Sequence, residues 1–312
     1  MNKPKNRLAK KLRREGFPGL VDSVNSFLRY PPLTELYYIV CLATGSSSLV
    51  LRRIQGSYMI LDLSKLGIHK DLFLYGVREP SATKIFKKEL RKGMYVLDIG
   101  ANIGYYTLIE ASIVREEGHV WAIEPSPQNI RLLIQNLSLN GYNNISVRKV
   151  AIGDRVGSSF LNVSREAPNL DRIATSKVKK SKNRFRINMI TLDKFVEEER
   201  IARVDFIRSD VEGFEHRIIC GGKKTLEKLS PKLFIEIHLK KMEEYGDSIK
   251  DMLGELSNYN YYLKYLVWEP NKVPIYLKKP GAPTTAIIKS DVPVGELIKK
   301  EKLRFFVRDG TH

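Results

Sequence analysis

The 312-residue sequence has only two cysteines, Cys41 and Cys220, which lie far apart in the chain. Two distant cysteines cannot form the dense disulfide framework of small secreted domains, and their spacing is not that of a cysteine-based metal site. The sequence therefore fits a protein of a reducing compartment.

Long apolar segments are also lacking. The longest apolar run near the N-terminus, Leu36 to Ala43, is far shorter than the roughly 18 to 20 residues that span a bilayer. Pro31, Pro32 and Glu35 precede this run and no small-residue cleavage site closes it, so it does not resemble a secretory signal. We expect a cytoplasmic protein, with peripheral contact to a membrane left open.

Acidic residues are scarce relative to basic ones, at 35 against 53, which gives a net charge of +18. Much of the excess lies in two clusters, a basic arm (Lys3, Lys5, Arg7, Lys10, Lys11, Arg13, Arg14) and a second group (Lys177, Lys179, Lys180, Lys182, Arg184, Arg186). Such clusters attract nucleic acid, anionic lipid head groups or phosphorylated substrates, although a solvated tail and a solvated hairpin tip are equally consistent with them. No aromatic residue precedes Phe17, which argues against a base-stacking surface in the arm.

The sequence lacks two glycines of a dinucleotide-binding turn. A buried strand runs into Gly100, but Asn102 and Tyr105 stand where that turn needs glycine. The spacing of Asp98, Gly100, Asn102 and Gly104 instead suits S-adenosylmethionine, which carries no phosphate and presents an ammonium, a carboxylate and a sulfonium. Asp98 would orient the turn and the cationic end of the cofactor. The alternative is a plain strand-to-helix turn in which the acid serves as a helix cap.

A second strand ends at Glu124, about twenty residues after the turn. A carboxylate at that place can accept hydrogen bonds from both ribose hydroxyls of a nucleoside cofactor. The pairing of Glu124 with the glycine turn favours cofactor binding over a purely structural turn.

Strand and helix patterns alternate along most of the chain, which predicts an α/β fold with a mostly parallel sheet. We predict a disordered basic arm over residues 1–18, an N-terminal extension over 19–92 and a catalytic domain over 93–312, with hairpins inserted at about 154–190. After the strand before Gly100, further strands are predicted at 119–123, 145–150, 204–209, 233–237, 261–268 and 303–307.

Taken together, the motifs resemble the FkbM-type family of S-adenosylmethionine-dependent methyltransferases. The matching pieces, in the order of the family, are Tyr75, Arg78–Pro80, Asp98–Gly104, Glu124–Pro125, Ala151–Asp154, Thr191–Asp193, Asp210–Glu215 and Glu236–His238. The resemblance covers about residues 56 to 240. Arg208 and Ser209 depart from it, because such proteins more often have a lysine and an apolar residue there.

The resemblance implies a Rossmann-like sheet of seven strands and methylation of a hydroxyl on a sugar or another natural product. It also implies that the backbone of Ala151 contacts the adenine and that Glu79 closes over the amino-acid end of the cofactor. These two assignments depend on the resemblance more than on the residues themselves.

The position of the chemistry follows from the predicted sheet. Ligands of open α/β sheets bind beyond the carboxyl ends of the strands, where Asp98, Glu124, Asp210 and His238 all fall. These four side chains are therefore expected to line one cleft.

His238 is the first candidate for the general base that removes a proton from an acceptor hydroxyl, and Asp210 is the second. Glu236 lies two residues before His238 on a strand and so shares its face, where it can orient the imidazole or the substrate. The alternative is a histidine that only bonds a neighbouring loop. Glu212 and Glu215 can contact substrate or cap the next helix. A cation held by Asp210, Glu212 and His238 is chemically reasonable, but no spacing requires it.

The favoured hypothesis is an O-methyltransferase acting on a small molecule or glycan. The charge leaves a ribose-directed RNA methyltransferase as an alternative, although the chain has neither the Asn/Asp-Pro-Pro-aromatic motif nor the Pro-Cys nucleophile of base-modifying enzymes. A further alternative is a non-catalytic basic scaffold at a membrane. The basic arm leaves an anionic surface or a phosphorylated substrate as possible partners.

Overall fold

The computed structural model describes residues 38, 40, 49–163, 171–174, 183–259, 261–268, 286–289 and 303–309. The predicted disordered arm at 1–18 and four of the six residues of the second basic group lie outside these ranges. Within the described ranges, no helix has the length and apolar character that crossing a membrane requires.

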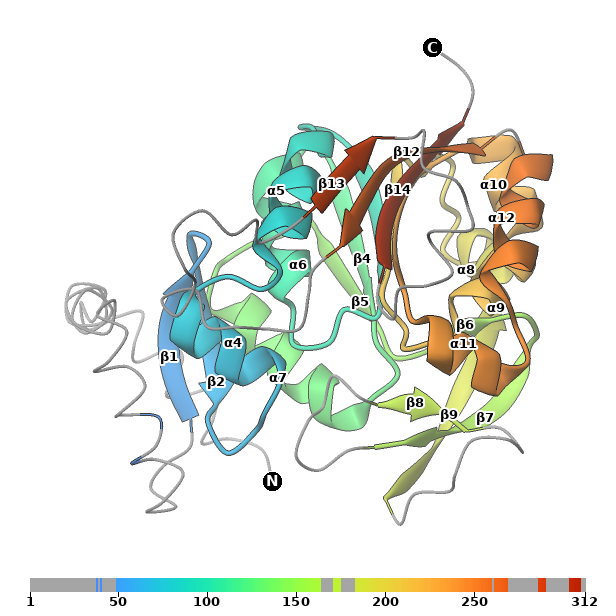
Figure 1. Ribbon diagram of the computed structural model, residues 1–312. Helices are drawn as coiled ribbons and strands as arrows, with labels where there is room; N and C mark the ends of the chain where they lie inside the picture. Colours follow the sequence, from blue (N-terminus) through green and yellow to red (C-terminus); the bar gives the residue numbers. More distant parts are fainter. Residues whose placement is uncertain are drawn as a thin grey trace.

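An eight-stranded sheet forms the centre of the molecule (Figure 1). Its order is β13-β12-β14-β11-β10-β3-β4-β5, made of β3 (Tyr95–Ile99), β4 (His119–Ile123), β5 (Ile145–Arg148), β10 (Phe206–Ser209), β11 (Lys232–Ile237), β12 (Tyr261–Trp268), β13 (Ala286–Lys289) and β14 (Leu303–Asp309). The neighbouring strands β11, β10, β3, β4 and β5 are parallel to one another, and β14, β12 and β13 are antiparallel to their neighbours.

The α/β fold predicted from the sequence is confirmed, but the sheet has eight strands rather than seven. The additional strand, β13, is a four-residue apolar segment in a proline-containing stretch. Its length is below that of an average strand, and it pairs only at the edge of the sheet, so sequence periodicity gives it no distinct signal.

Helices cover both faces of the sheet (Figure 1). One face carries α5 (Pro80–Glu89), α6 (Tyr105–Val114) and α7 (Pro127–Ser138), and the other α8 (Leu192–Glu198), α9 (Glu215–Cys220), α10 (Lys223–Leu229) and α12 (Ile249–Asn258). Strand side chains alternate between the two cores, because successive residues of a strand point to opposite faces. Phe206 and Phe234, for example, pack edge-on against Phe86 of α5 at centroid distances of 5.4 and 5.3 Å.

The extension before the sheet contains a hairpin of β1 (Leu49–Ile54) and β2 (Ser57–Asp62), followed by α4 (Ile68–Tyr75). Two asparagines of the α7 region hold it in place. Asn136 Oδ1 accepts a 2.7 Å hydrogen bond from the Ile60 amide, and Asn140 Oδ1 accepts one of 2.7 Å from the Tyr58 amide. These bonds satisfy the free edge of β2 and fix the extension beside the carboxyl ends of the parallel strands.

A second, smaller sheet follows β5 and has the order β6-β9-β7-β8. It consists of β6 (Ala151–Gly153), β7 (Gly157–Asn162), β8 (Arg172–Ile173) and β9 (Arg184–Thr191), with β7 and β9 antiparallel. The sheet lies beneath the carboxyl ends of the central strands, beside α11 (Leu239–Tyr245) (Figure 1). It therefore supplies a wall to any ligand held at those strand ends.

Candidate active site

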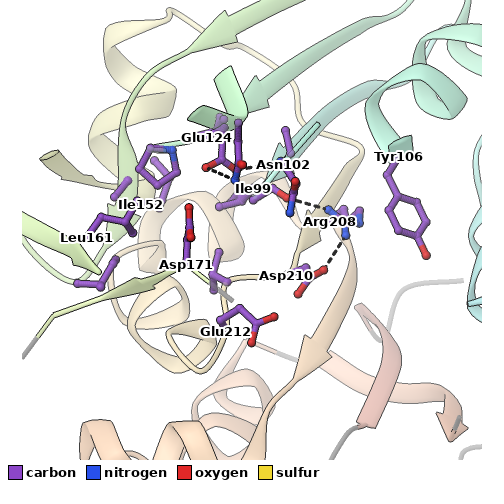
Figure 2. Close-up of a pocket in the computed structure, with 18 of the residues that line it drawn as sticks. Ile99, Asn102, Tyr106, Glu124, Ile152, Leu161, Asp171, Arg208, Asp210 and Glu212 are labelled. Carbon is purple, nitrogen blue, oxygen red and sulfur yellow. Dashed lines mark hydrogen bonds and ion pairs between the residues drawn. The ribbon is translucent and has the colours of Figure 1, made fainter. Parts of the chain in front are cut away.

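A pocket lies at the carboxyl ends of β3, β4 and β10, as expected for an open α/β sheet. The glycine turn after β3 and Glu124 after β4 form one end, and Asp210 and Glu212 after β10 form the other (Figure 2). Leu161 and Asp171 of the smaller sheet region close one side. The pocket is thus built by the main sheet, the smaller sheet and the extension together, since Ile68 and Arg78 also line it.

The glycine turn is held tightly against the end of β10. Gly100 has φ +85°, and a Cβ on it would lie 2.2 Å from the carbonyl oxygen of Asp210, so no other residue fits. Asn102 is also left-handed, with φ +52°. The turn therefore has one backbone conformation, set by direct contact between two strand ends.

Glu124 connects the turn to the second strand. Its Oε2 accepts a 2.8 Å hydrogen bond from the Asn102 amide, and its Oε1 accepts bonds from the Ser126 amide at 2.8 Å and from Asn129 Nδ2 at 3.4 Å. Burial, with a smaller contribution from the nearby Asp171 carboxylate, raises the pKa of Glu124 to about 7 although these donors lower it. A carboxylate offers about four lone-pair sites, so Glu124 retains capacity for a hydroxyl donor.

Asn102 and Ala151 also lie at the end of the pocket that Glu124 forms. The Oδ1 atom of Asn102 is buried and has no hydrogen-bond partner among the described residues. An unsatisfied buried acceptor is costly, so its presence in a pocket wall fits a ligand that donates a hydrogen bond. Ala151, which begins β6, is buried and lines the same pocket.

Asp98 differs from the expectation that it lines the cleft. Its side chain is fully buried behind the turn, where Oδ2 accepts a 2.5 Å bond from Thr107 of α6 and Oδ1 pairs with Arg208 at 2.8 Å. Asp98 points to the α6 face of the sheet, because it occupies the same side of β3 as Val96. The residue supports the pocket and does not form its wall.

Arg208 joins the two ends of the pocket. It lies directly across from Asp98 in the parallel pairing of β10 with β3, and its Nη2 donates to Asp210 Oδ2 at 3.0 Å. Its guanidinium also stacks 4.0 Å from the ring centroid of Tyr106. In the sequence, Arg208 is recognisable only as a departure from a family pattern. A buried arginine in an otherwise apolar strand already indicates that acidic partners lie beside it.

Glu79 also lies outside the pocket wall. It is buried at the N-cap of α5, where Oε1 pairs with Arg78 at 3.1 Å and Oε2 accepts from the Tyr106 hydroxyl at 3.3 Å. Arg78 and Tyr106 themselves line the pocket. In this conformation Glu79 orients two pocket residues and does not close over the site.

His238 follows β11 and is surrounded by carboxylates. Its Nδ1 is 2.9 Å from Glu215 Oε1, and its Nε2 is 3.3 Å from Glu236 Oε1 and 3.6 Å from Glu212 Oε2. The predicted shared face of Glu236 and His238 is confirmed by this contact. His238 itself is not in the pocket wall, but it adjoins the wall residue Glu212. Of the four strand-end residues expected to line one cleft, therefore, only Glu124 and Asp210 do so.

Lys241 of α11 is a basic residue beside Glu212 that the sequence did not reveal as part of the site. It forms an ion pair with Glu212. Burial and the neighbouring Arg172 lower the pKa of Lys241 to about 8. The turn that carries Glu212 reaches α11 only because residue 213 is glycine, with φ +103° and a hypothetical Cβ 2.5 Å from Lys241 Cβ. No local sequence signal relates Lys241 to the turn.

Asp210, Glu236 and His238 have the ligand types and the proximity of a cation site, with their ligand atoms within 4.8 Å of one another. Arg208 and Lys241 already bring positive charge to Asp210 and to the adjacent Glu212. Two of the carboxylates of the cluster therefore have a protein cation as partner, while Glu215 and Glu236 contact the imidazole of His238.

Comparison with known proteins places this pocket in a family. Residues 98–263, slightly more than half of the chain, match the model of the methyltransferase FkbM domain. A protein-L-isoaspartate O-methyltransferase of Methanothrix thermoacetophila is 33% identical over 88 residues, which are 28% of this chain and 38% of that protein. The hexuronic acid methyltransferase AglP of Haloferax volcanii is 25% identical over 160 residues, 51% of this chain and 62% of that protein.

Among solved structures, the FkbM methyltransferase of Methylobacillus flagellatus KT aligns with a TM-score of 0.43 and 16% identity, over 75% of this chain and 49% of that one. The chain thus spans less than two thirds of the length of each of these relatives. The family match includes both the turn after β3 and the histidine after β11. The chain belongs to the methyltransferase FkbM domain family.

Proposed function

We propose that this protein is an S-adenosylmethionine-dependent O-methyltransferase whose acceptor is a hydroxyl of a sugar, a glycan or another small natural product. The observation that carries the proposal is the pocket itself, which has a nucleoside-type cradle at Glu124 and, at its other end, Asp210 and Glu212, the latter 3.6 Å from His238. Family membership supports the same reaction class.

Glu124 and the glycine turn are the residues that would hold the cofactor. Glu124 would accept a hydrogen bond from the ribose, and the Asn102 side chain would accept one from the amino group. Ala151 and Ile152, which line the pocket at the start of β6, would contact the adenine. When bound, S-adenosylmethionine supplies a methyl group that its sulfonium makes electrophilic.

The protein's own task is to align the acceptor and to remove its proton, because a neutral alcohol is a weak nucleophile. His238 would take that proton through Nε2, while Glu215 fixes the ring by bonding Nδ1 at 2.9 Å. Glu236 and Glu212 would stabilise the protonated imidazole from 3.3 and 3.6 Å. Asp210, which faces the pocket and is oriented by Arg208, is the second candidate base.

The acid cluster favours a hydroxyl over a carboxylate as the methylated group. Glu212, Glu215, Glu236 and Asp210 gather around His238, so an anionic acceptor oxygen placed there would meet like charges. A carboxylate also needs no general base. A hexuronic acid, the substrate class in the name of one relative, fits this site if a ring hydroxyl points toward His238.

Titration calorimetry with S-adenosylmethionine tests the cofactor assignment. We expect binding by the wild type, about 10- to 100-fold weaker binding by Glu124→Gln because a charged acceptor is lost, and no change in Glu116→Gln, a matched substitution of an exposed acid. Equal affinity in all three proteins would contradict the assignment.

A labelling experiment tests the acceptor. The protein is incubated with methyl-labelled cofactor and fractionated host extract, and the label is followed into glycan, lipid, small metabolites and RNA. Label in glycan or small metabolites supports the proposal. Label entering RNA with steep salt dependence would replace it with ribose methylation, as the net charge of +18 allows.

A further inference from the structure

A second cluster of ligand-type side chains lies where α9 packs against α12. These two helices cover the face of the sheet opposite to α6. His216 and Cys220 are four residues apart on α9 and therefore share one side of that helix. Glu255 of α12 reaches them from across the helix interface. None of these three residues has a place in the proposed methyl transfer.

The three ligand atoms are mutually close. His216 Nε2 is 3.5 Å from Cys220 Sγ and 3.5 Å from Glu255 Oε2, and Cys220 Sγ is 3.1 Å from Glu255 Oε2. Tetrahedral Zn²⁺ with the usual bond lengths of about 2.3 Å to sulfur and about 2.1 Å to nitrogen and oxygen separates its ligand atoms by about 3.4 to 3.6 Å. Two observed separations match this spacing, and the third requires a shift of about half an ångström.

The surroundings resemble those of ligands in metal sites. A metal-binding histidine usually donates its other ring nitrogen to a carboxylate. His216 Nδ1 lies 3.4 Å from Asp247 Oδ1 and is buried without a hydrogen-bond partner among the described residues. Arg217 fixes Asp247 with a 2.7 Å bond, and Lys223 pairs with the outer oxygen of Glu255 at 3.1 Å.

We propose that His216, Cys220 and Glu255 bind one borderline-soft divalent cation of the Zn²⁺ class, with the fourth coordination position open to water. Imidazole and thiol ligands select Zn²⁺ over Mg²⁺ and Ca²⁺, which require oxygen ligands. The three side chains are partly exposed, so a cation can enter without unfolding of the helices. Cysteine spacing in the sequence gives no signal for such a site, because the other two ligands would be a histidine and a distant glutamate.

The alternative role for Cys220 is that of a reactive or redox-sensing thiol. Such cysteines have low pKa values, whereas burial and the adjacent Glu255 raise the pKa of Cys220 to about 12. These surroundings favour the protonated thiol over the thiolate that a redox-sensing cysteine requires. Metal binding would displace this proton, as it does at other thiolate sites.

A bound cation would clamp α9 to α12. The residue before His216 is Glu215, which bonds His238 Nδ1 in the candidate active site. The cation would therefore fix the helix end that carries Glu215, although none of its three ligands lines the pocket. Its expected effect is on stability, with no part in proton transfer.

Metal binding to tag-free, chelator-treated full-length protein tests the proposal. Zn²⁺ is titrated in competition with a chromophoric chelator, and Co²⁺ is used as a spectroscopic probe, because thiolate ligation gives a near-ultraviolet charge-transfer band. We expect one Zn²⁺ per chain, a Co²⁺–thiolate band, a rise in melting temperature with Zn²⁺, and no such rise with millimolar Mg²⁺.

The variants separate this site from adventitious binding. Cys220→Ser is expected to lose the thiolate band and to bind Zn²⁺ at least about tenfold more weakly, and Glu255→Gln to bind more weakly while keeping the band. Cys41→Ser, which removes the other cysteine of the chain, should behave as wild type. Absence of the band in wild type, or equal Zn²⁺ affinity in wild type and Cys220→Ser, would overturn the proposal. Because no readout uses S-adenosylmethionine, failure here leaves the proposed methyl transfer untouched.

Discussion

The two ends of the pocket are built in different ways. At the end formed by the glycine turn and Glu124, the contacts join a carboxylate to backbone amides and one asparagine, all within about thirty residues of sequence. At the end formed by Asp210 and Glu212, with His238 adjoining Glu212 behind the wall, the contacts join charged side chains from separate segments. Backbone donors cannot titrate and move little, which suits holding a cofactor, whereas a cluster of acids around an imidazole can redistribute a proton.

Because the two ends differ in this way, we expect substitutions at each end to affect different properties. Changes at the turn end should alter cofactor affinity, and changes at the acid end should alter turnover. Arg208 is the exception, because it contacts Asp98 behind the turn and Asp210 at the other end.

The largest effect is expected for His238→Gln. Glutamine keeps a polar side chain among the surrounding acids but cannot accept and release a proton near neutral pH, so turnover should fall about 100- to 10,000-fold. Affinity for S-adenosylmethionine should stay within about twofold, since the polar side-chain contacts of His238 among the described residues are to Glu212, Glu215 and Glu236 and not to the glycine turn. His119→Gln, at a partly buried histidine bonded to Ser146, is the control and should keep full activity. A parallel loss of cofactor affinity in His238→Gln would break the separation of the two ends.

The next effect concerns folding stability and Arg208. Its replacement by methionine leaves the fully buried Asp98 carboxylate without its cationic partner, which should cost about 3 to 5 kcal/mol in urea denaturation. Arg203→Met, at an exposed arginine that pairs with Asp205, should cost less than about 1 kcal/mol.

A double variant distinguishes the charge pair from simple packing. Asp98→Asn with Arg208→Met removes both charges, so it should recover part of the loss seen in Arg208→Met alone. If the two single costs simply add, the Asp98–Arg208 pair does not couple the turn to β10, and the connection between the two ends of the pocket lies elsewhere.

The turn end could be predicted from sequence because its contacts are local. A buried strand, glycines at fixed spacing and an acid after the next strand specify their own geometry, and Glu124 lies where that pattern predicts. The parallel order of the central strands was predictable for the same reason, since strand and helix patterns alternate along the chain. The hydrogen-bond partners of Asp98 were not, because they are Thr107 on α6 and Arg208, which is 110 residues away.

Most of the acid end, and the charged residues that approach the turn end from distant segments, required the structure. Nothing in the local sequence indicates that Lys241 reaches Glu212, or that Asp171 approaches Glu124 from the smaller sheet region. Glu110 is a further example, since it lies in an ordinary helical pattern yet is fully buried, and burial together with Asp98 raises its pKa well above the usual range. Such groups are recognisable only when tertiary neighbours are known, because burial and charge partners are set by the fold.

The smallest and most specific effect is the pH dependence of cofactor binding, which tests whether the turn end is as fixed in charge as its backbone donors suggest. Glu124 is the one titrating group in its hydrogen-bond set, and burial raises its pKa to about 7. An acid with a raised pKa in the folded state stabilises the fold below its unfolded value, and this contribution is lost as pH rises through about 7. The ionised form, which accepts hydrogen bonds best, therefore predominates only above that pH.

Affinity for S-adenosylmethionine should consequently fall about tenfold between pH 8 and pH 6, because below its pKa Glu124 must first lose a proton. The stabilisation of the protein by saturating cofactor, measured as a shift in melting temperature, should be larger at pH 8 than at pH 6 for the same reason. Glu124→Gln cannot titrate and should show a nearly flat dependence, with weaker binding throughout. If wild type and Glu124→Gln lose affinity in parallel as the pH falls, the titrating group is not Glu124, and proton control would have to be assigned to the acid end alone.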